Sequence, residues 1–309
     1  MKSAHVVRNY QQQDFTAFVR LNMNFNKSDA VKQSDSLDAL TQLLKKPGYE
    51  ATRDLLVAEV NGIIIGYVSV IPELGIERVI LDYLFHPAYC TGTVPRDMFN
   101  CALGRGKELG AKVAHVNLSS AELATTDLLT NLGFHIVRRY HALKIDLSKV
   151  NLEIIEQLDS VCCHLESGQE GKLSKIQNSC FKNMWGYEPC SGEQIIWWLN
   201  FRRNCPDDII LALKKDKVLG FCWTGTGCGN DMATGKPKGR IYMLGVDSKC
   251  RNTGMGRRLL LEGLLYLKRK GREIIEITVG SDNDEALSLY HSVGFKLSEN
   301  TLWYEKVID

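Results

Sequence analysis

The sequence predicts an α/β protein with two similar domains in tandem, each a mixed, twisted sheet flanked by helices. Three observations predict this fold class. The chain has 309 residues, about twice the length of a common domain. Residues 85–134 align with residues 246–295 without a gap, at a constant offset of 161. In both copies, strand-like and helix-like segments alternate, which favours a mixed sheet covered by helices.

The repeat is supported by residues that end helices or precede strands in both copies. The aligned pairs include Gly110 with Gly271, Gly133 with Gly294, and Phe134 with Phe295. Farther upstream, residues 58–67 align with residues 212–221 at an offset of 154. The second copy therefore has an insertion, which we place in the glycine-rich stretch 225–239 and interpret as a long loop. We predict one domain over residues 1–149 and a second over residues 150–309.

The elements of the second copy can be placed in order. Runs rich in branched and aromatic residues predict strands, and apolar residues at helical spacing predict helices. In the short helix 284–292, Ala286, Leu289, Tyr290 and Val293 fall on one face. The predicted elements are a helix at 172–183, strands at 209–214 and 218–224 joined by a turn at Lys215-Asp216, a strand at 240–246, a helix at 254–270, a strand at 273–279, the helix at 284–292 and a strand at 301–307.

Composition narrows the functional classes. Lysine plus arginine number 38 and aspartate plus glutamate 36, so the net charge is +2, which argues against a nucleic-acid-binding protein. The apolar runs are shorter than the roughly 20 residues of a membrane-spanning helix, and the first residues lack the apolar core of an export signal. Ten scattered cysteines without a Cys-x-x-Cys pair favour mostly buried thiols in a reducing cytoplasm. We expect no metal, no membrane and no nucleic-acid partner.

The junction before the long second-copy helix carries the first chemical signal. Two glycines, Gly254 and Gly256, stand two positions apart where a strand passes into a helix. A turn of this kind leaves backbone N–H groups pointing toward one point, and a helix N-terminus favours an anion. Arg257 and Arg258 are unfavourable in a first helical turn unless an anion such as a pyrophosphate binds there. A basic, solvated helix start remains the alternative for this loop taken alone.

A second motif follows the next strand. It reads Asn283-x-x-Ala286-x-x-Leu289-Tyr290-x-x-x-Gly294-Phe295, and the first reads Arg251-x-x-Gly254-x-Gly256. Together and at this separation, the two motifs resemble the GNAT superfamily of acetyl-CoA-dependent N-acetyltransferases. The resemblance covers residues 172–309 and extends to the first copy through the repeat. The tandem arrangement and the segment 185–189 (Trp-Gly-Tyr-Glu-Pro) also resemble mycothiol synthase and its two-domain relatives.

This resemblance implies a role for each matching residue. Backbone amides of the loop would hold the pyrophosphate of acetyl-CoA, and Arg257 and Arg258 would neutralise it. The end of the preceding strand would pair with the pantetheine arm, and Asn283 would contact that arm or order the strand–helix junction. Tyr290 would protonate the leaving thiolate. The loop residues are Arg251, Asn252, Thr253, Gly254, Met255 and Gly256, and the strand residues are Leu244, Gly245 and Val246.

Several assignments stay open. Tyr290 shares a face with Leu289 and Ala286 and could be an ordinary core residue. Cys250 is not needed as a nucleophile, because a bound amine can attack the thioester directly. Histone-type relatives carry a catalytic glutamate six residues before the position of Val246, and this chain has Arg240 there. Glu276 and His291 are interpreted as satisfied or solvated polar residues. An ordered water could act as the general base instead, and we assign this role to no residue.

The first copy has lost the motif. At the offset of 161, Arg251 aligns with Cys90, Gly254 with Thr93, and Gly256 with Pro95, which lacks an N–H group. Asn283 and Tyr290 align with the residues Glu122 and Leu129, so the acid is absent as well. Gly92 lies one position out of register. We therefore predict that the first domain keeps the fold without acetyl-CoA chemistry.

The resemblance implies an acyltransferase that moves an acetyl group from acetyl-CoA to a primary amine of a small molecule or peptide. The amine would attack directly in a ternary complex, and a backbone N–H near residues 244–246 would polarise the thioester carbonyl. The alternative is a CoA-binding sensor or interaction protein without turnover. The acceptor and the oligomeric state are not indicated by the sequence.

Overall fold

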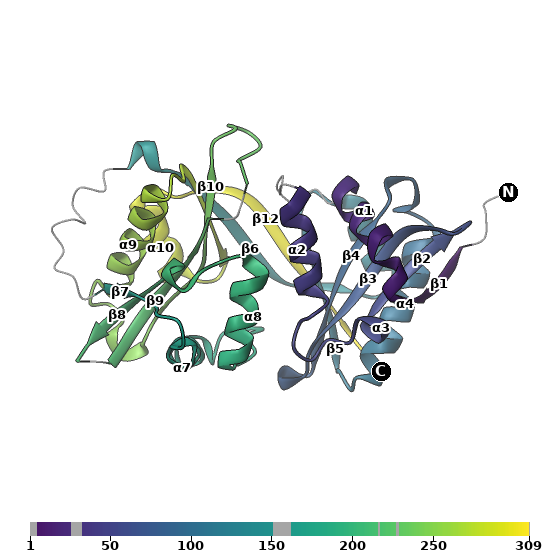
Figure 1. The fold of residues 1–309 in the computed structure, drawn as a ribbon, viewed down its shortest axis with the longest axis horizontal. Helices are drawn as coiled ribbons and strands as arrows, with labels where there is room; N and C mark the ends of the chain where they lie inside the picture. The colour runs from purple at the N-terminus through teal and green to yellow at the C-terminus, as the bar shows by residue number, and fades with distance from the viewer. Residues whose placement is uncertain (1–4, 26–32, 151–161, 216, 227–228, 309) are drawn as a thin grey trace. The chain divides into compact units, whose positions relative to one another are not determined.

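The computed structural model describes residues 5–25, 33–150, 162–215, 217–226 and 229–308, which form two compact units (Figure 1). The first unit contains the described residues up to 139 together with 300–308. The second unit contains the described residues from 140 to 299. Each unit is a mixed sheet with helices on its faces, which confirms the predicted fold class.

In the first unit, the strands run in the order β1-β2-β3-β4-β5-β12. All neighbours are antiparallel except β4 and β5, which pair in parallel from Arg78 opposite Val113 to Ile80 opposite His115. Its strands are β1 (Val6–Asn9), β2 (Leu55–Val60), β3 (Ile63–Glu73), β4 (Arg78–Phe85), β5 (Val113–Ser119) and the end of β12 (Lys296–Val307). Its helices are α1 (Phe15–Phe25), α2 (Gln33–Leu43), α3 (Ala51–Asp54), α4 (Thr93–Glu108) and α5 (Leu123–Asn131).

The second unit repeats this plan with the order β6-β11-β10-β9-β8-β7. Here β10 and β11 form the parallel pair, from Lys238 opposite Ile274 to Ile241 opposite Ile277. Its strands are the end of β6 (His135–Asp146), β7 (Cys162–His164), β8 (Ile209–Lys214), β9 (Lys217–Gly225), β10 (Lys238–Val246) and β11 (Ile274–Gly280). Its helices are α7 (Glu170–Phe181), α8 (Gly192–Arg202), α9 (Met255–Arg269) and α10 (Asp284–Val293).

The repeat read from the sequence is present in the structure. Strands β5 and β11 are related by the offset of 161, and β2 and β8 by the offset of 154. Gly110, Gly133, Gly271 and Gly294 all have positive φ values, between 72° and 111°, which explains why glycine occupies these helix ends. The predicted strands and helices from residue 172 onward are confirmed, with ends shifted by up to five residues. The predictions did not include α8 or β7.

The last strand of each copy belongs to the unit formed mainly by the other copy. Residues 140–146 of β6 pair antiparallel with β11, and residues 301–307 of β12 pair antiparallel with β5. This division differs from the contiguous domains 1–149 and 150–309. The reason is physical: the last strands of two similar folds can be exchanged with one strand still completing each sheet, so a strand pattern alone does not specify which sheet the strand completes.

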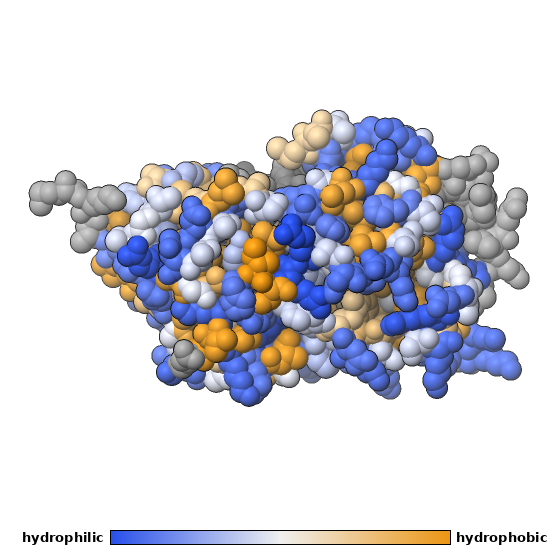
Figure 2. Space-filling view, turned by 180° about the vertical axis from the view of Figure 1, so that it is seen from behind, coloured by the Kyte–Doolittle hydropathy of each residue, from blue (hydrophilic) through white to orange (hydrophobic). Residues whose placement is uncertain are grey.

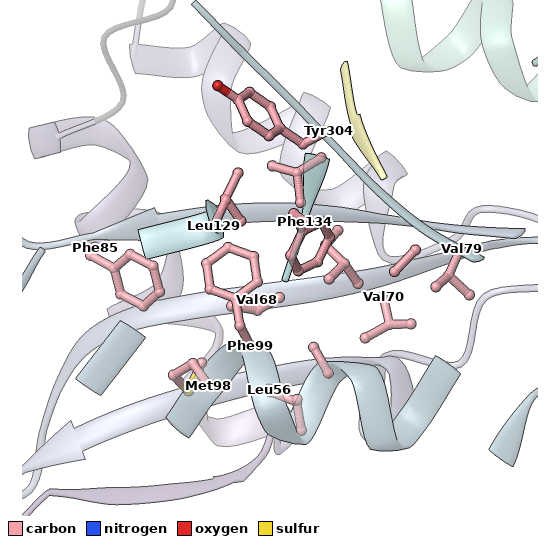
Figure 3. Close-up of a cluster of buried hydrophobic side chains, with 14 of the residues drawn as sticks. Leu56, Val68, Val70, Val79, Phe85, Met98, Phe99, Leu129, Phe134 and Tyr304 are labelled. Carbon is pink, nitrogen blue, oxygen red and sulfur yellow. The ribbon is translucent and has the colours of Figure 1, made fainter. Parts of the chain in front are cut away.

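Each sheet is covered by helices that bury apolar side chains. In the first unit, Leu129, Phe134 and Tyr304 point into one cluster with Phe99 and Val68 (Figure 3). In the second unit, α9 and α10 cover one face of the sheet, whereas α7 and α8 cover the other. The first face includes Leu259 and Ile277, and the second includes Trp223.

The predicted loop 225–239 is partly ordered by pairing. Asn230 forms an antiparallel bridge with Pro237, and β10 already begins at Lys238. Asp231 is 3% exposed and bonds the Lys144 ammonium group, with Oδ2 2.7 Å from Nζ. At the predicted turn, Lys215 has a left-handed φ of 47°, and residue 216 lies outside the described residues. The inserted residues therefore form a turn that is anchored to β6.

The surface is largely hydrophilic on the face drawn in Figure 2, where hydrophobic residues form separate groups among polar ones. Among the helices of the described segments, none combines the length and the apolar character needed to cross a membrane.

Candidate functional site

The site begins where the parallel pair of the second unit separates. Strand β10 pairs with β11 only as far as Ile241, but its pairing with β9 continues to Val246, opposite Gly220. A register shift between Ile241 and Met243 marks the point of departure. Beyond it, Leu244, Gly245 and Val246 have no strand partner on the β11 side among the described residues. An extended chain with amide groups can pair with such an edge.

The loop after β10 turns tightly into α9. The amide of Cys250 donates to the carbonyl oxygen of Asp247 at 2.7 Å, and the Thr253 hydroxyl donates to the carbonyl oxygen of Cys250 at 2.7 Å. Asn252 and Gly254 have left-handed φ values of 61° and 85°. These contacts are local to the loop, so its backbone conformation is set by its own sequence.

The backbone N–H groups of residues 251–257 form a row of open donors. Within the described part of the chain, none of them has a hydrogen-bond acceptor, and the first paired amide is that of Arg258, which donates to the Gly254 carbonyl at 3.0 Å. Helix α9 adds the positive end of its dipole, and its first turn contains no acidic residue. The start of α9 is thus suited to bind an anion with several oxygen atoms.

The two glycines of the loop serve different needs. Gly254 has a φ of +85°, which a residue with a side chain rarely adopts. A Cβ atom on Gly256 would meet Leu289 at 3.5 Å and Val246 at 3.8 Å, which are ordinary van der Waals contacts. The backbone conformation therefore favours glycine at position 254, whereas neither the backbone nor the packing requires it at position 256.

The three arginines predicted at this loop separate in space. Arg251 donates from Nη2 to the carbonyl oxygen of Cys180 at 3.4 Å, and Arg257 donates from Nη1 to the Ser292 hydroxyl of α10 at 2.9 Å. The Arg258 guanidinium lies beside the Cys162 thiol, and its Nε and Nη2 atoms are buried without an acceptor among the described residues. Successive helical residues project about 100° apart, so Arg257 and Arg258 do not face one bound anion together.

Asn283 and Met255 hold the ends of the two helices at the site. Asn283 is the N-cap of α10, and its Oδ1 accepts from the amide of Ala286 at 3.1 Å. Met255 is the first residue of α9 and packs partly against the core beneath it. The geometry shows Asn283 ordering the junction between β11 and α10.

We expect Asn283→Ala to lower the free energy of unfolding by about 1 kcal/mol, because the cap of α10 is lost. Asn283→Asp keeps a capping oxygen and should restore most of this stability. Urea unfolding of the two variants measures the difference. If Asn283→Asp keeps its stability but binds acetyl-CoA more weakly, the side-chain NH₂ group contacts the ligand as well as capping the helix.

Tyr290 lies almost entirely inside the second unit, with 6% of its surface exposed. Its ring packs against Phe295 with centroids 5.8 Å apart. The hydroxyl group forms no hydrogen bond within the described residues, although buried hydroxyl groups are usually paired. Burial raises the Tyr290 pKa above its ordinary value, with a smaller contribution from Cys222. The phenol is therefore protonated at neutral pH.

The two residues considered as bases from the sequence are each bonded to the protein through at least one atom. Glu276 is 9% exposed, and its carboxylate lies 3.2 Å from the Lys144 ammonium group and 3.3 Å from that of Lys238. His291 is bonded through Nδ1 to the Phe295 carbonyl at 3.0 Å. Glu276 is thus an ion-pair partner and His291 supports the end of α10.

The corresponding loop of the first unit differs as expected from its sequence. Pro95 lies in the first turn of α4, and Gly92, with a φ of 89°, is its N-cap. Glu122 accepts a hydrogen bond from the Tyr83 hydroxyl at 3.1 Å. Leu129, which aligns with Tyr290, is fully buried in the cluster of Figure 3. This loop therefore has one amide fewer, and leucine stands at the position that aligns with Tyr290.

Sequence reasoning missed an aromatic group at the C-terminal end of α8. The Arg202 guanidinium carbon lies 4.0 Å from the ring centroid of Tyr242, 4.5 Å from that of Trp198 and 5.1 Å from that of Trp223. Tyr242 stands at the register shift of β10, beside the separated strands. The aromatic spacing of residues 197, 198 and 201 was the available signal for a helix here.

Residues 172–295 match the model of the acetyltransferase (GNAT) family. A mycothiol acetyltransferase of Nocardiopsis dassonvillei is 38% identical over 101 residues, which is 32% of this chain and 31% of that protein. The mycothiol acetyltransferase of Mycobacterium sp. strain MCS is 23% identical over 280 residues, covering 87% of this chain and 88% of the relative.

Solved structures share the fold along the full length of the chain. A GCN5-related N-acetyltransferase from Sphaerobacter thermophilus has a TM-score of 0.68 at 17% identity, covering 98% of this chain and 96% of that one. A tandem GNAT protein from the clavulanic acid biosynthesis pathway has a TM-score of 0.72 at 11% identity, covering 99% of both chains.

Proposed function

We propose that this chain, a tandem GNAT protein whose residues 172–295 match the acetyltransferase family, transfers an acetyl group from acetyl-CoA to a primary amine. The observation that carries the proposal is the row of open N–H donors at the start of α9, next to the unpaired edge of β10. These two features suit the two parts of acetyl-CoA that differ most, its pyrophosphate and its amide-containing arm. The relatives named as mycothiol acetyltransferases support the same reaction class.

In the proposed mechanism, amides of residues 252–257 hold the pyrophosphate, and Arg257 and Arg251 supply positive charge at the rim of the loop. Leu244, Gly245 and Val246 pair with the pantetheine arm as an added strand would. A backbone N–H of this stretch stabilises the charge that develops on the carbonyl oxygen as the amine attacks. We leave Arg258 out of this binding group, because its guanidinium lies beside Cys162.

The proton balance gives Tyr290 its role. When the carbon–sulfur bond breaks, the electron pair goes to sulfur, and the Tyr290 hydroxyl donates a proton to the resulting thiolate. The attacking nitrogen loses its proton to solvent or to the acceptor's own surroundings. Burial raises the pKa of Tyr290, so the phenol carries its proton throughout the neutral range and can supply it when the thiolate leaves.

The test is calorimetric titration with acetyl-CoA, followed by time-dependent release of CoA thiol in the presence of amines. Thiol release that depends on the amine and is accompanied by the N-acetylated product supports the proposal. Tight acetyl-CoA binding with no turnover on any amine would instead identify a CoA-binding sensor.

We expect one acetyl-CoA per chain. Pro95 removes an amide at the first-unit loop and Leu129 replaces the acid, so Cys90→Ala and Pro95→Gly should leave the acetyl-CoA Kd within about twofold of the wild type. The stoichiometry from the same titration provides the check. Two bound molecules per chain would show that the first unit also binds the ligand.

A further inference from the structure

The sheet face covered by α7 and α8 contains charged residues that the proposed mechanism does not use. Ile241 of β10 is buried under α9, so its neighbour Arg240 projects to the opposite face. Tyr242 and Met243 pack against the cluster under α7 and α8. Arg240 therefore lies on the same side of the sheet as Tyr242 and Met243.

Arg240 is not needed to neutralise its neighbour Glu276. The two Glu276 oxygens lie 3.2 Å from Lys144 and 3.3 Å from Lys238, whereas the Arg240 Nη2 lies 3.8 Å away. The Arg240 side chain is 41% exposed and makes no hydrogen bond within the described residues. A guanidinium has five N–H donors, so most of those of Arg240 are available to a ligand.

Arg240 shares one carboxylate with two other cations. Lys144, Lys238 and Arg240 all lie beside Glu276, and Lys144 also bonds Asp231. The Arg202 guanidinium lies over the ring of Tyr242, two positions along β10 from Arg240.

We propose that Arg240 recognises an anionic group, a carboxylate or a phosphate, on the amine acceptor. This inference rests on the proposed acetyl transfer. Arg240 precedes Leu244 by four residues, which is about 13 Å along an extended strand. The long Arg240 side chain can cover part of this distance. The rest would be covered by an acceptor that has several bonds between its amine and its anionic group. Guanidinium groups bind carboxylate and phosphate through paired hydrogen bonds.

The experiment compares amines that differ only in the anion. Suitable pairs are glucosamine 6-phosphate with glucosamine, and 5-aminopentanoate with 5-aminopentanamide. For the wild type we expect kcat/KM to favour the anionic member of at least one pair by about tenfold to a hundredfold. Arg240→Met should abolish this preference and leave kcat/KM for the neutral member within about twofold. The pair that responds distinguishes phosphate from carboxylate.

Two controls separate recognition from general damage. Arg269→Met removes an exposed arginine of α9 beside Cys162 and should keep the preference. Arg240→Lys keeps the charge without the paired donors and should retain only part of it. Acetyl-CoA affinity and thermal unfolding of Arg240→Met should match the wild type.

The proposal is overturned if the wild type has the higher kcat/KM for the neutral amines. It is also overturned if Arg240→Met changes kcat/KM for both amines of a pair by the same factor. Neither result would contradict acetyl transfer itself. If acetyl-CoA binds but no amine is acetylated, acetyl transfer itself fails. Binding of N-acetylglucosamine 6-phosphate and N-acetylglucosamine in the presence of CoA then decides the anion site. Equal affinity for the two sugars overturns it, and tighter, Arg240-dependent binding of the phosphate supports it.

Discussion

We expect Gly256→Pro to raise the Kd for acetyl-CoA at least about tenfold, because it removes one backbone N–H from the row at the start of α9. A hydrogen bond to a charged group contributes about 1.5–3 kcal/mol, and the ligand oxygen left unpaired adds to the loss. Proline is tolerated in the first turn of a helix, where the amide has no partner in the helix itself. The first unit supports this expectation, since Pro95 stands in the first turn of α4.

Gly256→Ala is the matched control. It keeps the N–H, and its Cβ would make only ordinary contacts with Leu289 and Val246. We expect its acetyl-CoA Kd to stay within about threefold of the wild type, because the backbone N–H of residue 256 is the group proposed to bind the pyrophosphate. Calorimetry on both variants measures the contrast, and circular dichroism confirms that α9 is retained. Wild-type binding by both Gly256→Pro and Arg251→Ala would remove the loop from the binding site.

The local part of the fold was predictable because it is encoded in short-range patterns. The strand at Ile209–Lys214 has the predicted limits, and the helix starting at Asp284 has the predicted buried face around Tyr290. Glycines with positive φ, such as Gly271 and Gly294, mark the ends of helices that periodicity alone would leave uncertain. In these elements, propensity and packing favour the same structure.

The sheet to which a strand belongs was not predictable in this way. Residues 301–307 have the pattern of a strand in either unit, and only the pairing with β5 decides between them. Likewise, the sequence groups Arg257 with Arg258, but the helix sends one to Ser292 and the other to Cys162. Both outcomes depend on contacts between residues far apart in the chain, which no local pattern records.

The availability of Arg240 depends on the same kind of contact. The sequence shows only that arginine replaces a glutamate expected from histone-type relatives. Arg240 keeps open donors because Lys144 of β6 and Lys238 of β10 lie closer to the Glu276 carboxylate of β11. The proposed acceptor side of the site thus depends on tertiary structure, whereas the proposed phosphate loop is recognisable from a short motif.

We expect Tyr290→Phe to lower kcat by about 10²- to 10⁴-fold, the usual contribution of a positioned general acid. The Kd for acetyl-CoA should change little, because the proposed phosphate and strand contacts are untouched. The variant should also fold normally, since the hydroxyl has no hydrogen-bond partner within the described residues and the ring remains packed on Phe295. Single-turnover kinetics at saturating acetyl-CoA, which isolate the transfer step from product release, measure the effect.

The contrast with Tyr266→Phe and the pH dependence test whether the effect is chemical. The Tyr266 hydroxyl donates to Asp208 Oδ1 at 2.9 Å, so its loss should reduce stability by about 1 kcal/mol and leave kcat unchanged. Burial raises the Tyr290 pKa, so the phenol keeps its proton as the pH rises. Deprotonation of Tyr290 should therefore lower activity only above pH 10, the ordinary pKa of tyrosine. A Tyr290→Phe variant with the wild-type kcat would show that the thiolate leaves without this acid, and Tyr290 would then be a core residue of α10.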